Sequence, residues 1–214
     1  GGQVVGGQAS IVQNSNALNI NQGTDRAAID WQSFNVGQGN TVNFNQPSAS
    51  SIALNRVLGS DVSVIQGAIN ANGQVFLVNQ NGILFTPTAQ VNVGGIVAST
   101  QSISTADFMA GKYTFSGNST GVVENHGNIT TANGGNVTMN SSAGRVAIVY
   151  SGAVRSTVTT LGAGGVDITA AKGLTVNTSN ISAAGTGHVN LNVTRDSTSA
   201  SQDFKIHYAN ITTG

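Results

Sequence analysis

The chain has 214 residues, of which 7% are charged, with 8 Lys and Arg against 8 Asp and Glu, and it contains no Cys. Ordinary soluble domains carry about 25% charged residues, so Asn, Ser, Thr and Gln must keep this protein in solution. The formal net charge of +0 disfavours nucleic acid and anionic membranes as partners, and the absence of Cys excludes a disulfide scaffold and thiolate metal sites.

No apolar stretch approaches the roughly 18 residues of a membrane span, and the first residues lack the basic and apolar regions of a signal peptide. We therefore expect either a cytosolic chain or one from which a signal has been removed. Val, Ile and Leu recur in every region, which indicates a folded protein rather than a disordered one.

Short runs of alternating apolar and polar residues predict strands along the whole chain, since strict alternation is typical of a half-buried strand. Examples are residues 41–44, 73–78, 90–93 and 136–139. Pairs such as Asn81-Gly82 and Gly94-Gly95 separate the runs, and both residue types tolerate the positive φ of tight turns. Residues 25–31 and 104–110 are the candidates for short helices.

Internal repetition gives the strongest signal for the fold. Residues 126–140 align without a gap with residues 178–192, and the shared positions are Asn128/Asn180, Ile129/Ile181, Ala132/Ala184, Gly135/Gly187, Val137/Val189 and Asn140/Asn192. The start of the unit occurs again at residues 210–214. Each copy has the pattern of a strand, a Gly-rich turn and another strand.

We take five apolar positions as equivalent and inward-facing, one in each coil: Ile129, Ile148, Ile168, Val189 and Ile211. A step of about 20 residues with two or three short strands is the size of one coil of a parallel β-helix, which predicts some ten coils in all. A β-sandwich is the main alternative. The gapless repeat and the 5% aromatic content argue against the sandwich.

Large aromatic residues gather in the first half of the chain, at Trp31, Phe34, Phe44 and Phe76. A stack of coils needs a terminal cap, because its first coil otherwise presents an open sheet edge. We expect these four residues to belong to the cap or the core.

The runs Ile20–Gly37, Thr41–Pro47, Leu54–Val57 and Ile65–Ile83 closely resemble the secretion domain of two-partner-secretion exoproteins. These are the filamentous-haemagglutinin-like and high-molecular-weight adhesins and the related haemolysins of Gram-negative bacteria. The family signature Asn-Pro-Asn-Gly-Ile falls on Asn79, Gln80, Asn81, Gly82 and Ile83, with Gln80 in the place of Pro. Because Pro fixes φ and removes a donor, we expect Gln80 to soften the turn without abolishing it.

The resemblance implies one elongated secretion domain over residues 1–214, with the cap and early coils in 1–120 and regular coils in 121–214. We expect an all-β, right-handed, single-stranded parallel β-helix, a solenoid, with an N-terminal cap and small extra-helical β elements. The domain would be the N-terminal part of a larger exoprotein, an adhesin, that is secreted or carried on the surface of a Gram-negative bacterium.

The implied partner is an outer-membrane two-partner-secretion barrel transporter, which recognises the chain through its periplasmic domains and passes it unfolded. Outside, the domain folds first and nucleates the β-helix behind it. We expect a monomer without cofactor or metal, without nucleic acid as a partner, and with contacts to a host cell surface made by the downstream passenger. A β-helical adhesive rod that itself binds a host or cell surface is the alternative function.

The motif residues allow two readings each. Asn79–Ile83 is either a recognition element for the transporter or a strand-ending turn. Asn55 and Arg56 form the second motif, in which Arg56 is either an ordinary surface residue or a buried one satisfied by backbone carbonyls or by Asp61. The carboxylates and the three His are dispersed, and no nucleophile or phosphate-loop motif occurs, so we do not expect an enzyme.

Overall fold

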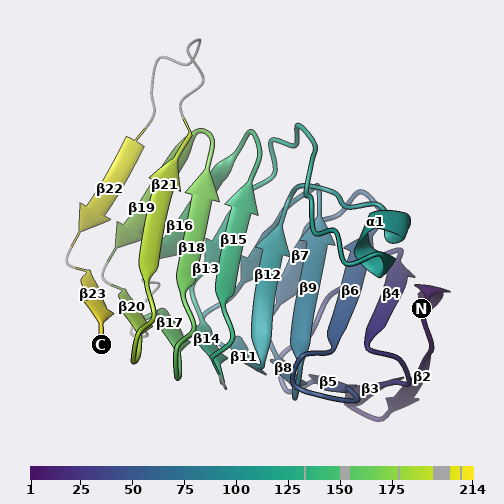
Figure 1. Ribbon diagram of the computed structural model, residues 1–214. Helices are drawn as coiled ribbons and strands as arrows, with labels where there is room; N and C mark the ends of the chain where they lie inside the picture. The colour runs from purple at the N-terminus through teal and green to yellow at the C-terminus, as the bar shows by residue number, and fades with distance from the viewer. Residues whose placement is uncertain (133, 150–154, 178, 195–202, 208) are drawn as a thin grey trace.

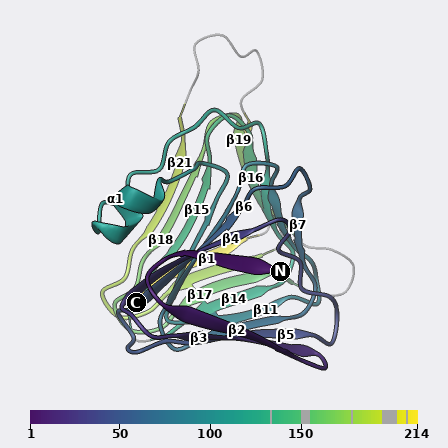
Figure 2. The same ribbon diagram turned by 90° about the vertical axis from the view of Figure 1, so that its right-hand side faces the viewer.

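The computed structural model describes residues 1–132, 134–149, 155–177, 179–194, 203–207 and 209–214. Within these residues the chain forms a parallel β-solenoid of about seven turns, in which three sheets enclose a common interior (Figures 1 and 2). Each sheet takes one strand from nearly every turn, so strands that are neighbours in a sheet are far apart in the sequence.

Sheet A has eight strands, in the order β1 (Gly2–Gly6), β4 (Arg26–Trp31), β6 (Ile52–Val57), β9 (Gln74–Asn79), β12 (Gly95–Ser99), β15 (Val137–Ser141), β18 (Val166–Ala170) and β21 (Val189–Val193). Sheet B has nine, in the order β2 (Ala9–Asn14), β3 (Ala17–Gln22), β5 (Thr41–Asn45), β8 (Ala68–Ala71), β11 (Gln90–Val93), β14 (Asn128–Thr131), β17 (Thr157–Thr160), β20 (Asn180–Ala183) and β23 (Asn210–Thr213). Sheet C has six, in the order β7 (Ser63–Ile65), β10 (Ile83–Phe85), β13 (Val123–Asn125), β16 (Arg145–Val149), β19 (Gly173–Asn177) and β22 (Asp203–His207).

The interior is filled by columns of apolar side chains that stack from coil to coil. In sheet B one column consists of Val42, Ile69, Val91, Ile129, Val158 and Ile181. Each of these side chains is at most 5% exposed. Burial of one Val or Ile contributes about 1.5–3 kcal/mol, so every added coil contributes its own share to the stability of the stack.

The first edge of the solenoid is covered by antiparallel strands. β1 runs antiparallel to β4 in sheet A, and β2 runs antiparallel to β3 in sheet B. The four aromatic residues expected in the cap or core lie outside β1, β2 and β3. Trp31, Phe34 and Phe44 are buried in the main core behind these strands. Phe76 is buried in a second apolar cluster, which consists of Ala28, Ile52, Leu54, Phe76, Val78, Ile103 and Phe108.

The aligned repeat is confirmed, and it spans two coils rather than one. Ile129 and Ile181 both pair with Val158 in sheet B, and Val137 and Val189 both pair with Val166 in sheet A. The third copy, at β23, pairs with β20 as the repeat requires.

The five equivalent inward positions and the count of ten coils are wrong. Ile148 lies in sheet C, Ile168 and Val189 lie in sheet A, and only Ile129 and Ile211 share sheet B. Coils also vary in length. The coil between Ala98 and its partner Met139 is much longer than the coil between Ile65 and its partner Phe85. Inward Val and Ile residues occur in all three sheets, so spacing alone assigns no residue to a sheet.

One of the two predicted helices is also wrong. Residues 26–31 form β4, which pairs with β1 on one side and β6 on the other. Both faces of β4 are covered, with Ile29 in the main core and Ala28 in the second cluster, so the strand lacks the alternation expected of a half-buried strand. The other helix is confirmed as α1 (Thr105–Met109), capped by the Ser104 side chain, which accepts a hydrogen bond from the Asp107 amide at 3.0 Å.

Candidate functional site

The two motif segments lie side by side in sheet A. β6 carries Asn55 and Arg56, and β9 ends at Asn79. The two strands pair in parallel, with Arg56 opposite Val78 and Val57 opposite Asn79. The motifs are well separated in the sequence, and one turn of the solenoid brings them together.

The Asn79–Gly82 segment is a tight turn fixed by its own side chains. The Gly82 amide donates to the Asn79 carbonyl at 3.1 Å, which closes the turn. The Asn79 Oδ1 atom accepts from the Asn81 amide at 2.9 Å and from Asn81 Nδ2 at 3.1 Å. Gly82 has a φ of 120°, which favours Gly over other residues. Gln80 is exposed at the second position of the turn, the position that Pro favours in such turns.

The turn is also bonded to the coil that precedes it. The Asn79 Nδ2 atom donates to the Asp61 carbonyl and to Ser63 Oγ, both at 2.9 Å. The Asn81 Nδ2 atom donates to the Gly59 carbonyl at 2.7 Å. The Asn79 side chain is fully buried, so its donor and acceptor atoms serve the protein itself rather than the surface.

The following coil covers the other side of the turn. Ser119 donates from its hydroxyl to the Gln80 carbonyl, and the Ile83 amide donates to the Val122 carbonyl at 2.9 Å. Ile83 is 1% exposed. The signature segment therefore joins three successive coils. No pattern in the sequence predicts its contacts with residues 119–122.

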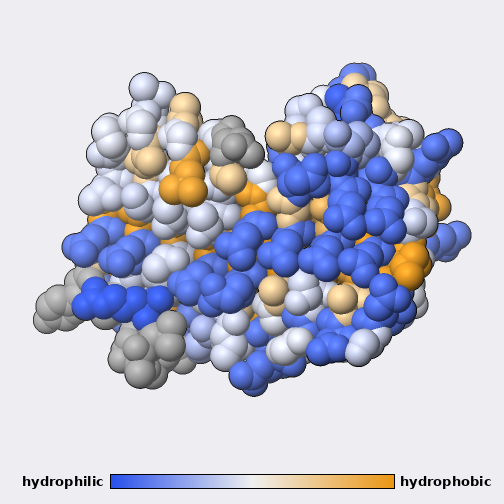
Figure 3. Space-filling view, turned by 90° about the horizontal axis from the view of Figure 1, so that it is seen from below, coloured by the Kyte–Doolittle hydropathy of each residue, from blue (hydrophilic) through white to orange (hydrophobic). Residues whose placement is uncertain are grey.

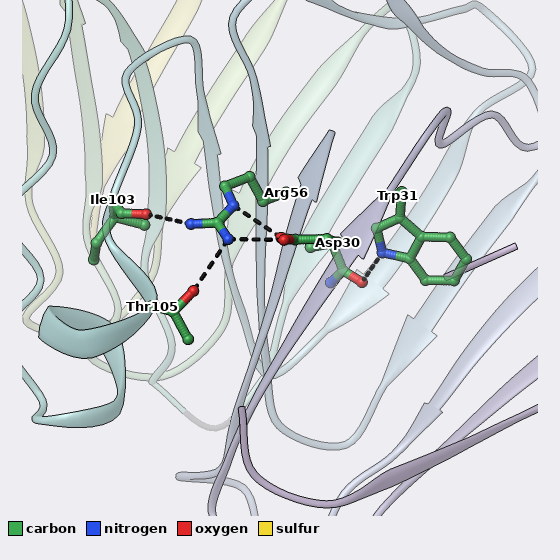
Figure 4. Close-up of polar contacts among 6 residues, drawn as sticks. Asp30, Trp31, Arg56, Ile103 and Thr105 are labelled. Atoms are coloured by element: carbon green, nitrogen blue, oxygen red, sulfur yellow. Dashed lines mark hydrogen bonds and ion pairs between the residues drawn. The ribbon is translucent and has the colours of Figure 1, made fainter. Parts of the chain in front are cut away.

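Arg56 is largely buried and holds an ion pair with Asp30 (Figure 4). Its Nε and Nη2 atoms donate to the two carboxylate oxygens of Asp30 at 2.8 and 2.9 Å, and the two side chains are 18% and 16% exposed. The Nη1 atom donates to the Ile103 carbonyl at 3.0 Å, and Nη2 donates to Thr105 Oγ1 at 3.0 Å.

This arrangement corrects the expected partner of Arg56. A backbone carbonyl takes part, as the buried alternative predicted, but the carboxylate is Asp30 and not Asp61. Asp30 lies directly opposite Arg56 on the neighbouring strand β4, whereas the backbone carbonyl of Asp61 bonds to Asn79. Asp30 could not be identified from the sequence, because the length of the coil between the two strands was unknown.

Asn55 faces the main core, on the opposite side of β6 from Arg56. It is fully buried, and its Oδ1 atom accepts from the Trp31 indole Nε1 at 3.1 Å. Its Nδ2 atom donates to the Ala53 carbonyl at 3.3 Å. Trp31 in turn packs edge-on against Phe34, with ring centroids 5.2 Å apart. The Asn55 amide thus satisfies a buried indole that would otherwise lack an acceptor.

A second apolar cluster lies on the outer face of sheet A and holds α1 against the coils. Phe76 is its centre, with ring centroids 6.1 Å from Phe108 and 5.4 Å from Tyr113. The Tyr113 hydroxyl accepts from Arg26 Nε at 2.8 Å, and this hydrogen bond is the main reason why the pKa of Arg26 is raised above its ordinary value. Arg56 and this cluster together attach residues 100–121, the segment that contains α1, to β4 and β6.

Two hollows are lined in part by residues of the turn. One of about 540 Å³ is lined by residues that include Gln80, Asn81, Val62, Leu84 and Glu124. The other, of about 200 Å³, is lined by Arg56, Leu58, Gln80 and Asn81 among others. Gln80 and Asn81 line both hollows.

The described residues show no clustering of three His, Asp or Glu side chains of the kind that holds a metal ion. Within the same part of the chain, no helix is long and apolar enough to cross a membrane. The side chains of Asn55, Arg56, Asn79 and Asn81 are hydrogen-bonded within the protein.

The chain matches the sequence profile of the family described as TPS secretion domain over residues 1–214. Two heme/hemopexin-binding proteins of Haemophilus influenzae are 45% identical over 103 residues and 43% identical over 98 residues. These matches cover 48% and 46% of this chain but only 11% of each relative, so the chain spans a small part of the curated relatives it matches.

Among solved structures, the crystal structure of the HMW1 secretion domain from Haemophilus influenzae has a TM-score of 0.65 at 24% identity, covering 89% of this chain and 64% of that one. At this identity the likeness shows the fold alone. The match to the family profile over the whole chain, together with the parallel solenoid, places the chain in the family of TPS secretion domains, the secretion domains of two-partner-secretion exoproteins.

Proposed function

We propose that this domain directs the export of a larger exoprotein, an adhesin, by binding the periplasmic domains of an outer-membrane barrel transporter while the chain is still unfolded. After passage it folds at the cell surface of a Gram-negative bacterium and nucleates the β-helix that follows. Secretion, the role of the family, is not an enzymatic one, and the proposal assigns no chemistry to the domain.

The burial of the motif side chains is the observation that carries the proposal. Asn55 and Asn79 are fully buried, and Ile83 is 1% exposed. Their polar atoms already bond to the Trp31 indole and to carbonyls of the preceding coil. A transporter that reads these side chains must therefore meet them before the coils close.

The register of the sheets supports folding outward from the N-terminal end. Within the described residues, the parallel strands of sheets A, B and C pair with strands of adjacent coils. A coil can therefore form on the one that emerged before it, without waiting for distant segments. The antiparallel β1 and β2 cover the first edge, so the stack can begin without an upstream neighbour.

A secretion assay tests the proposal. The chain is given a signal peptide and expressed with and without its barrel transporter, and its amount in the medium is measured. We expect export only with the barrel, and its loss in an Asn79→Ala/Asn81→Ala variant. An Asn190→Ala/Asn192→Ala variant is the matched control, because these two exposed Asn in β21 lie far from the turn. Export at the normal rate by the turn variant would contradict recognition through this segment.

A binding assay separates recognition of the unfolded chain from recognition of the folded domain. The isolated periplasmic domains of the barrel are mixed with the folded chain, or with an Ile129→Asp/Ile181→Asp variant whose two buried core positions carry charges. We expect the unfolded variant to bind and the folded chain to bind much more weakly. Equal binding by both would refute recognition before folding, and normal export of the variant would refute the role of folding outside.

A further inference from the structure

Sheet B presents an uncharged face along the whole solenoid. In the part of the chain that the structure describes, none of its nine strands contains an Asp, Glu, Lys, Arg or His, whereas β6 in sheet A carries Arg56 and β13 in sheet C carries Glu124. Most apolar residues of these strands point inward, apart from Val12, which is 43% exposed and lies opposite Asn19, so the outer face consists mainly of Asn, Thr, Ser and Gln. Figure 3 views the molecule from this side and shows a hydrophilic band running along it.

The centre of the face is a single row of asparagines in register. Asn19 pairs with Asn43, Asn43 with Asn70, and Asn70 with Asn92. The row continues along later coils with hydroxyl side chains, at Thr130, Thr159, Ser182 and Thr212. The amides are therefore confined in this row to the four coils nearest the N-terminal end.

Hydrogen bonds between coils hold these amides in one orientation. Asn43 Nδ2 donates to Asn19 Oδ1 at 3.0 Å, and Asn70 Nδ2 donates to Asn43 Oδ1 at 3.1 Å. A carboxamide has two N–H donors and two acceptor lone pairs, so the ladder uses one donor and one acceptor of Asn43. One donor and one acceptor of Asn43 remain for an outside partner, and the ladder has already fixed the side chain.

A hollow of about 580 Å³ lies over this row. Its lining includes six asparagines: Asn19, Asn43, Asn45, Asn70, Asn72 and Asn92. Asn45, Asn72 and Asn92 are exposed, and the three Asn of the ladder are half-buried. The hollow thus offers a dense array of neutral donors and acceptors at fixed positions.

We propose that this amide-lined hollow binds a neutral polysaccharide, with the sugar chain lying along the row of asparagines. A free donor beside a free acceptor matches a pair of neighbouring sugar hydroxyls. Successive coils are about 4.8 Å apart, close to the advance of one hexose unit along a chain, so consecutive sugars can meet consecutive amides. The lack of charge on sheet B excludes a polyanion as the preferred ligand. This binding role does not depend on the export role.

Binding is measured by calorimetry on the folded chain with three neutral probes, dextran, laminarin and yeast mannan, and with heparin as the charged comparison. We expect binding of at least one neutral polysaccharide, stronger for longer chains because adjacent sugars engage adjacent coils. The affinity should not change between low and high NaCl, because screening acts on charges. Binding of none of the neutral probes, or a preference for heparin that salt abolishes, would overturn the proposal.

An Asn43→Thr/Asn70→Thr variant tests the site itself. The two substitutions remove two amides from the row and put hydroxyl side chains in their place, as in the later coils. Thr is also a residue type that strands favour. We expect the affinity to fall by at least about tenfold, from the loss of two or more hydrogen bonds. The control, Asn190→Thr/Asn192→Thr on the exposed face of β21, should bind as the unchanged chain does.

The single variant Asn92→Thr, at an exposed strand position, keeps the test valid if the double variant does not fold. It should weaken binding by a smaller factor. Equal binding by the row variants and the control would overturn the proposal. So would a concentration-dependent dimer that the row substitutions abolish, with no polysaccharide bound, because the face would then serve a second copy of the chain.

Discussion

Replacing Arg56 with Met should destabilise the domain by about 2–3 kcal/mol, which is well above the effect of an ordinary surface arginine. The substitution leaves the Asp30 carboxylate, 16% exposed, without its cation, and it removes the donors to the Ile103 carbonyl and the Thr105 hydroxyl. Breaking a fully buried ion pair costs about 3–5 kcal/mol, and an exposed pair contributes about 0–1 kcal/mol. The Arg56–Asp30 pair lies between these limits, nearer the buried one.

Urea unfolding of four proteins measures this effect: the unchanged chain, Arg56→Met, Asp30→Asn and the double variant. We expect the double variant to be more stable than the sum of the single effects predicts, by about 1 kcal/mol or more, because it leaves no unpaired charge. Arg145→Met is the matched control, since Arg145 is exposed and its contact with Thr175 is 3.4 Å long, so its effect should stay within about 0.5 kcal/mol.

Hydrogen exchange shows where the effect acts. The guanidinium of Arg56 holds the segment that leads into α1, so in the Arg56→Met variant the amides of Phe108 and Ala110 should exchange faster. The amides of β18, several coils away, should not change by more than the global loss of stability requires. A loss below about 0.5 kcal/mol, the size of an exposed pair, or strictly additive single effects would refute the assignment of Arg56 as a buried clamp.

Three further substitutions have expected outcomes of different kinds. Gly135→Ala should destabilise the domain by more than about 2 kcal/mol, because its Cβ would overlap the Gly94 carbonyl oxygen. Gly23→Ala is the control, because its Cβ would lie at ordinary contact distances of 3.6 Å or more, and it should change the free energy of unfolding by less than about 1 kcal/mol. Gln80→Pro should raise the free energy of unfolding by about 0.5 kcal/mol, because it restricts the unfolded chain at a turn position that Pro favours; a lower urea midpoint would show that the Gln80 amide is needed. Phe108→Ala should cost about 3 kcal/mol by opening a cavity in the second apolar cluster, and limited proteolysis should then cut near α1 before it cuts the coils.

The fold could be predicted from the sequence because a solenoid repeats its own pattern. The pairs Ile129/Ile181 and Val137/Val189 identified the repeat, and both pairs occupy equivalent places in the structure. The register could not be predicted. Inward Val and Ile look alike in all three sheets, and the insertion of residues 100–121 lengthens one coil without any change of pattern in the strands around it.

The candidate site was predictable as a set of residues but not as a set of contacts. Asn79 and Asn81 could be assigned to a turn because Asn-Gly pairs favour turns locally. The partner of Arg56 depends on which residue lies opposite it one coil earlier, and that requires the coil length. Asp61 is nearer to Arg56 in the sequence, whereas Asp30 lies opposite Arg56 in the sheet and forms the ion pair with it.

The contacts of the Asn79–Gly82 turn also set an order of folding for a chain that emerges with its N-terminus first. The carbonyl partners of Asn79 and Asn81 lie 18 and 22 residues earlier in the chain, so both side chains can be satisfied as soon as the turn forms. The Ser119 donor to Gln80 lies 39 residues later.

The hydrogen bond from Ser119 to Gln80 can form only after residues 100–121, the insertion that carries α1, have emerged. Closing this longer loop also costs more conformational entropy. We therefore expect the signature segment to be buried in two steps, first by the coil before it and then by residues 119–122. Asn79 would thus be enclosed before Gln80 and Ile83 are covered, so the proposed recognition of the Asn79 side chain requires a chain in which the turn has not yet formed on the preceding coil.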